Sequence, residues 1–134
     1  MKPLDRESEM VFWKLTEGLT KVGDCRKING SIMAAFIEQT KLGPLVAITK
    51  FVDCPNGHLV REMDVAFLIS SIKAITGELV QDTDEQIYPV SYRRNGVKDD
   101  ALVIHNGRWN VRLELQTRIC QFAEQWMLDI STNQ

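Results

Sequence analysis

Residues 101–112 read ALVIHNGRWNVR, and this stretch indicates the fold class of the whole chain. An Asn-Gly pair, Asn106-Gly107, separates two short runs of residues that favour extended structure. A two-residue type I′ turn needs a positive φ at both central positions, which Asn and Gly tolerate best. The stretch therefore predicts a β-hairpin, and it raises the question of whether its cationic and aromatic side chains touch a partner.

Further strands are predicted upstream of this hairpin. Residues 45–52 (LVAITKFV) are apolar on both faces, which is typical of a central strand. Residues 32–39 are apolar and fit an extended segment, although Ala34-Ala35 would also suit a helix. Residues 59–69 alternate in a way that predicts an antiparallel strand, with Met63, Val65, Phe67 and Ile69 on one face.

The next segment has weaker patterns. Residues 70–75 suggest a short helical turn, and residues 78–86 suggest a loop. Residues 86–93 (QIYPVSYR) resemble a strand, but Pro89 cannot donate to a ladder. We therefore expect this strand at an edge of the sheet or at a bulge, and an exposed edge would also allow a homodimer.

An amphipathic helix is predicted at each end of the chain. Asp5 is the expected N-cap of the first, which ends at Gly18 or Gly23. Its apolar stripe comprises Val11, Phe12, Leu15, Leu19 and Val22. The stripe of the second comprises Leu115, Ile119, Phe122, Ala123, Trp126 and Ile130, flanked by Met127. The predicted fold is a single α+β domain over residues 1–134, an antiparallel sheet of about five or six strands with both helices on one face.

Composition limits the classes of function. The 134 residues are 44% hydrophobic and 25% charged, with a net charge of −2, so no global field attracts nucleic acid or anionic lipid. The first ten residues (MKPLDRESEM) lack the apolar region of a signal peptide, and no run approaches the ~20 apolar residues of a membrane helix. Cys25, Cys54 and Cys120 are expected to be reduced and mostly buried. We expect a cytoplasmic protein without a membrane segment.

Motifs for metal or catalytic chemistry are weak. Cys54 and His58 supply half of a zinc site at best. The chain has no Gly-x-Ser-x-Gly elbow and no glycine-rich phosphate loop, and its paired acids at 99–100 stand in turn-like surroundings. We therefore expect no metal, no cofactor and no catalytic residue, although a small enzyme of unrecognised type remains an alternative.

Charge is distributed unevenly, which draws attention to the C-terminal half. Residues 53–85 carry two basic and seven acidic side chains, whereas residues 86–118 carry six basic and three acidic ones. The basic segment mixes cations with aromatic rings, a combination enriched in protein-binding hot spots and also used to bind nucleic acid. The candidate partner-binding residues are Tyr92, Arg93, Arg94, His105, Arg108, Trp109 and Arg112.

A simpler interpretation is that Tyr92 and Trp109 pack beneath the helices while the arginines are solvated. Strand alternation predicts which side chains of residues 108–112 share a face. If Trp109 and Val111 face inward, then Arg108, Asn110 and Arg112 face outward together.

Several local features occur at familiar spacings. They include the Asn56-Gly57 turn before Leu59-Val60-Arg61, the segment Tyr88–Arg93, and the later residues Arg112, Leu115-Gln116, Phe122 and Trp126. In these features residues 45–131 resemble short proteins of unknown function encoded by phages, plasmids and integrated elements. The resemblance implies a mobile-element accessory protein and assigns no catalytic residue.

The sequence therefore favours a non-enzymatic accessory protein that binds another protein, with host defence, replication or transcription as candidate processes. A nucleic-acid-associated factor that uses the basic aromatic hairpin is the alternative.

Overall fold

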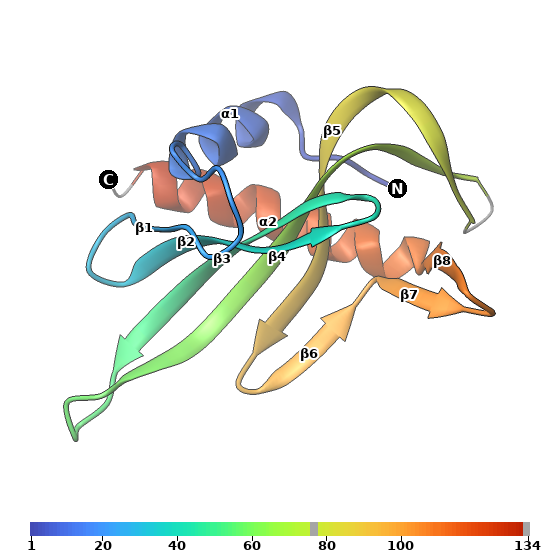
Figure 1. Cartoon of the computed structure of the whole chain (residues 1–134). Coiled ribbons are helices and arrows are strands. Elements are labelled where there is room, and N and C mark those ends of the chain that lie inside the picture. Colours follow the sequence, from blue (N-terminus) through green and yellow to red (C-terminus); the bar gives the residue numbers. More distant parts are fainter. Residues whose placement is uncertain (76–77, 133–134) are drawn as a thin grey trace.

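The computed structural model describes residues 1–75 and 78–132, and for residues 75, 78, 83 and 105 it describes the backbone alone. The described chain forms two helices and one antiparallel sheet of eight strands (Figure 1). In chain order the elements are α1 (Arg6–Leu15), β1 (Cys25–Lys27), β2 (Ile32–Thr40), β3 (Gly43–Asp53), β4 (Leu59–Ile75), β5 (Glu78–Arg94), β6 (Val97–Asp100), β7 (Leu102–His105), β8 (Arg108–Val111) and α2 (Leu113–Thr132). The predicted α+β class is confirmed.

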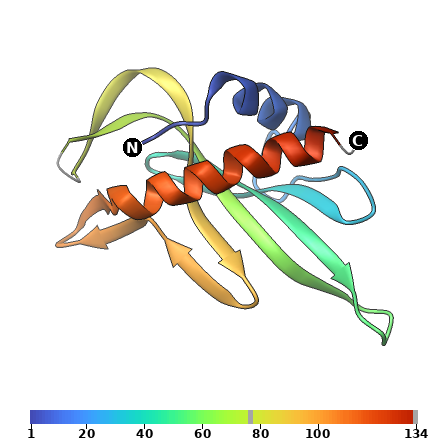
Figure 2. The same cartoon turned by 180° about the vertical axis from the view of Figure 1, so that it is seen from behind.

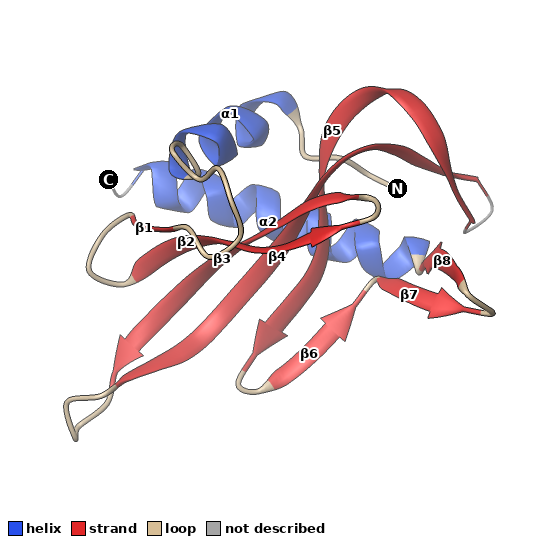
Figure 3. Cartoon of the chain, viewed as in Figure 1, coloured by secondary structure: helices blue, strands red, loops and turns tan. Residues whose placement is uncertain are grey.

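The sheet has more strands than the five or six expected. Its order is β1-β2-β3-β4-β5-β8-β7, with β6 paired to β5 (Figure 3). The strands without a sequence signal are β1 and β6, which have three and four residues. Such short segments have too little apolar alternation to stand out, and their pairing with long neighbours makes them strands.

Two Asn-Gly turns close hairpins in the sheet. Asn106 and Gly107 have φ values of 50° and 74°, and they join the antiparallel pair β7 and β8. Asn95 and Gly96, with φ values of 53° and 80°, join β5 to β6 in the same way. The hairpin predicted from residues 101–112 is confirmed.

Both helices cover the same face of the sheet, and α2 lies across it beside α1 (Figure 2). The core between the layers includes Phe12 and Phe67, whose ring centroids lie 5.0 Å apart. From α2, the predicted stripe packs into this core, and Met127 is fully buried. Burying this face supplies the main stabilisation of the fold.

The first helix begins as predicted and ends earlier. Asp5 is the N-cap, and its carboxylate accepts a hydrogen bond of 2.8 Å from the amide of Ser8. The helix ends at Leu15, shortly before Gly18 with a φ of +89°. Val22 therefore lies outside the helix and is exposed.

The prediction for residues 70–86 was wrong. Instead of a helical turn and a loop, the described residues extend β4 and β5 into a ribbon of two 17-residue strands. Apolar contacts on the open face stabilise it, and the hydroxyl of Tyr88 donates to the carbonyl of Ile72 at 2.6 Å. Cross-strand pairing thus overrides a weak local pattern.

Pro89 lies at a bulge, which confirms one of its two predicted settings. The register shifts between Ala66 and Phe67, which pair with Ser91 and Pro89, so Val90 is the extra residue. The alternative prediction, that this strand lies at an exposed edge of the sheet, was wrong because β5 has neighbouring strands on both sides in the sheet order. The N-terminal segment covers β5 next to the bulge through a bond from Leu4 N to Ile87 O (2.8 Å). Residues 91–94 of β5 also pair with β6, so a homodimer through this strand would require both the N-terminal segment and β6 to separate from it.

The cysteines are free, but only one of the three is buried. Cys25 is exposed on a three-residue edge strand, and Cys54 is half-buried in the β3–β4 turn. Cys120 is buried, which raises the pKa of its thiol to about 12. The expectation of mostly buried thiols was therefore wrong. Among the described residues, no helix is both long and apolar enough to cross a bilayer.

Candidate functional site

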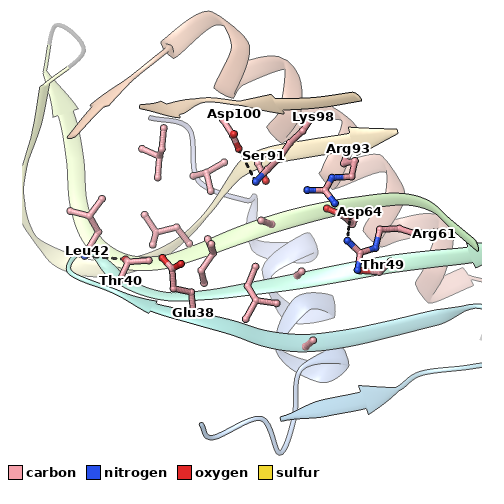
Figure 4. A pocket seen from close by; sticks show the side chains of 18 of the residues that line it. Glu38, Thr40, Leu42, Thr49, Arg61, Asp64, Ser91, Arg93, Lys98 and Asp100 are labelled. Carbon is pink, nitrogen blue, oxygen red and sulfur yellow. Dashed lines mark hydrogen bonds and ion pairs between the residues drawn. The ribbon is translucent and has the colours of Figure 1, made fainter. Parts of the chain in front are cut away.

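A pocket of about 380 Å³ opens on the face of the sheet that the helices leave uncovered (Figure 4). Residues of β2, β3, β4 and β5 line it, joined by residues of β6, β7 and β8. Pairing in the sheet places these residues in rows that run across the strands.

The central row is made of small side chains. Ala35 pairs with Ala47, Ala47 with Ala66, and Ala66 with Ser91. Because directly opposed residues project on the same face, these four side chains form a shallow floor that larger residues surround. The hollow therefore follows from residue size at matched positions of four strands.

Charged and polar residues form the next row. Thr49 pairs with Asp64, Asp64 with Arg93, and Arg93 with Lys98. Arg61 adds a second guanidinium, and its Nη1 lies 3.7 Å from Oδ2 of Asp64. We call this group the polar end of the pocket.

The opposite row is apolar. Leu45 pairs with Leu68, and Leu68 with Tyr88, while Leu42 and Leu102 pack against the same cluster. Four residues of β4 separate the apolar and polar rows, a distance of about 13 Å along the strand. The pocket is therefore amphipathic along its length.

Three polar residues at the floor and the polar end are buried, and none of their side chains makes a hydrogen bond among the described residues. Thr49, Asp64 and Ser91 are 7%, 8% and 5% exposed. Oδ2 of Asp64 has no hydrogen-bond donor, and neither hydroxyl makes a hydrogen bond within the part of the chain that the structure describes. Of these side chains, only Asp64 has a polar atom that is fully shielded from solvent and makes no hydrogen bond, and that Oδ2 lies 3.7 Å from Nη1 of Arg61. Leaving a buried acceptor without a hydrogen bond costs about 1–3 kcal/mol, so the arrangement favours a bound group that donates to Asp64.

Charge at the polar end is not balanced. Arg61, Arg93 and Lys98 contribute three cations, while Asp64 and Asp100 contribute two carboxylates. Lys98 Nζ lies 3.5 Å from Asp100 Oδ1, and Arg61 pairs with Asp64. Among the described residues, none pairs with the guanidinium of Arg93, which projects into the pocket (Figure 4). One positive charge is therefore left over at this end, whereas Glu38 lies at the apolar end.

The candidate residues from the sequence do not form one surface. Arg93 and half-buried Trp109 line the pocket on the open face. Tyr92 packs under α2, with its ring centroid 4.7 Å from that of Phe122. Arg94 lines a separate pocket on the helix side.

Two further candidates, Arg108 and Arg112, do not line the pocket. Arg108 and Arg112 are exposed and Val111 is buried, as the predicted alternation requires, whereas Trp109 and Asn110 are both half-buried. The side chain of His105 lies outside the described residues.

Sequence reasoning missed most of the pocket. Thr49 and Asp64 are polar residues within strongly apolar strands, and this is the signal that could have identified them. Ser91 and Lys98 have no comparable signal, because only the register brings them to the same face.

The two residues considered for zinc form a turn. Cys54 N donates to the carbonyl of His58 at 2.9 Å, which closes the β3–β4 connection. Within the described residues, no group of three or more His, Cys, Asp or Glu side chains is placed to hold a metal ion. Comparison with known proteins found no matching family model, no matching curated protein and no matching solved structure.

Proposed function

We propose that this protein is a non-enzymatic accessory protein that binds a partner protein through the open face of its sheet. The observation that carries the proposal is the amphipathic pocket, in which a polar end with one unpaired cation and one buried acceptor without a hydrogen bond lies opposite an apolar row. The other face is already used by the two helices. Trp and Arg in a partly desolvated depression are typical of the centre of a protein interface, and here Trp109 and Arg93 hold those positions.

The resemblance to mobile-element proteins suggests the biological context of this proposal. In that context the partner is a host or phage protein, with defence, replication or transcription as the process concerned. A nucleic-acid-associated role receives less support from the geometry. The basic candidates are divided between two faces, and the ring of Tyr92 packs edge-on against Phe122 beneath α2, where it is not free to stack on a base.

Affinity capture from bacterial lysate, with mass-spectrometric identification, tests the proposal. Ala35→Trp fills the pocket at a half-buried lining position, and Val22→Trp adds the same ring at an exposed position outside it. We expect a nuclease-resistant protein to be captured by wild type and by Val22→Trp, and to be lost with Ala35→Trp. The captured protein, once purified, should bind with the same ranking.

Two results would contradict the proposal. Equal capture by all three folded proteins would show that the open face is not the binding surface. Capture that nuclease abolishes would favour the nucleic-acid alternative.

A further inference from the structure

We propose that the pocket receives an amphipathic helix of the partner protein, and that an Asp or Glu at the N-terminal end of its apolar stripe binds Arg93. This inference rests on the proposed function and specifies the chemistry of the bound segment. It is carried by the charge, the burial and the dimensions of the pocket.

The charge of the polar end specifies a carboxylate. Arg61 and Lys98 already face carboxylates, whereas Arg93 has no ion-pair partner among the described residues. A guanidinium presents a planar pair of donors that matches a carboxylate, so one acidic side chain would neutralise the remaining positive charge.

The carboxylate of Asp64, beside Arg93, indicates that the bound segment also supplies a hydrogen-bond donor. Oδ2 of Asp64 makes no hydrogen bond although the residue is only 8% exposed, because its nearest cation, Nη1 of Arg61, stays at an ion-pair distance of 3.7 Å. The first turn of a helix has backbone N–H groups without intrahelical partners, and it also favours an acidic side chain. A helix that begins over Asp64 therefore supplies the missing donor and the carboxylate together.

The position of the pocket favours a helix over an extended peptide. The pocket lies on the face of paired strands, so a bound strand could not form backbone hydrogen bonds with the sheet. A helix satisfies its own backbone. At a rise of about 1.5 Å per residue, about 13 Å between polar and apolar rows spans eight to nine residues, roughly positions i, i+4 and i+8.

Selection from a display library tests this sequence pattern directly. The library presents a 16-residue helix with varied residues on one face, and binders are enriched on wild type. We expect enriched sequences to carry Asp or Glu at position i and large apolar residues at i+4 and i+8. The enriched sequence is then synthesised as a capped peptide and its affinity measured by titration calorimetry.

A double-mutant cycle locates the carboxylate. Replacing the peptide's acid by its amide should weaken binding to wild type by at least about tenfold, and binding to Arg93→Gln by less than about twofold. Arg94→Gln is the matched control, because Arg94 is the adjacent cation and lies on the helix side. It should behave as wild type, and thermal unfolding should show all three proteins folded.

The outcomes separate this inference from the proposed function. Peptides that bind without an acid preference, and that Ala35→Trp excludes, would overturn the inference and leave the proposed function standing. Peptides that still bind Ala35→Trp would overturn both. Failure to enrich any helix on wild type would overturn the inference, as would competition by octanoate alone at the pocket, because the site would then take a free carboxylic acid.

Discussion

Replacing Gln116 with methionine should destabilise the protein by removing a buried amide that ties the N-terminal segment to the sheet. Gln116 is fully buried in α2. Its Oε1 accepts from Lys2 N at 2.7 Å, and its Nε2 donates to Lys2 O at 2.7 Å and to Pro89 O at 3.1 Å. Methionine has a similar shape without these groups, so the substitution isolates the hydrogen bonds from the packing.

The magnitude follows from those three bonds. Each contributes about 0.5–1.5 kcal/mol net, which gives a range of about 1.5–4.5 kcal/mol. The backbone groups of Lys2 can regain water because that residue is exposed, whereas Pro89 is fully buried and its carbonyl remains unsatisfied. We therefore expect a loss of about 2–3 kcal/mol in the free energy of unfolding.

Urea denaturation measures this loss, with Gln121→Met as the matched control because Gln121 is an exposed residue of the same helix. Hydrogen exchange at the amide of Leu4, which bonds to Ile87 O, should accelerate in Gln116→Met alone. A loss below about 0.5 kcal/mol, or one equal to that of Gln121→Met, would refute the assigned role of the amide.

Three further predictions concern a glycine, a helix cap and the cysteines. Gly43→Ala should cost at least about 2 kcal/mol in urea denaturation, because Gly43 has a φ of +142° and a Cβ would collide with the carbonyl oxygen of Ile69. Asp5→Ala should cost about 1 kcal/mol at pH 7. A hydrogen bond from a first-turn amide lowers the pKa of Asp5 below its usual 3.8, so this stability is present above that pH and is lost as the pH falls through the lowered value. A titration in which the difference between wild type and Asp5→Ala does not shrink as the pH is lowered would contradict the capping role. In a timed iodoacetamide pulse at pH 8, exposed Cys25 should be alkylated first. Buried Cys120, whose thiol pKa is raised to about 12, should be alkylated only after unfolding. Mass spectrometry that detects early alkylation of Cys120 would disprove its burial.

Local patterns were sufficient where a segment carries its own signal. The Asn106-Gly107 turn, the N-cap at Asp5 and the apolar stripe of the last helix each depend on residues close in the chain. The extent of β4 and β5 beyond residue 70 was not predictable in this way, because those segments become strands by pairing with each other. Pairing partners of this kind are set by the whole fold.

The pocket could not be predicted from local patterns either. Thr49, Asp64, Arg93 and Lys98 come from four strands, and only the register places them in one row. Sequence analysis identified Arg93 by its charge, but it could not separate Arg93 from the adjacent Arg94, which has the same charge and lies on the other face.

The sequence by itself determined the α+β class, the two helices and the hairpin, because helical and strand periodicity are local properties of the chain. Only the tertiary structure decided which side chains reach the open face. In a regular strand Tyr88 and Tyr92 would share one face, since four residues separate them. The bulge at Val90 adds one residue, so Tyr88 faces the open side, Tyr92 packs under α2, and Arg93 enters the pocket. A shift of one residue reverses the face of every side chain beyond it, and pairing with β4 sets that shift.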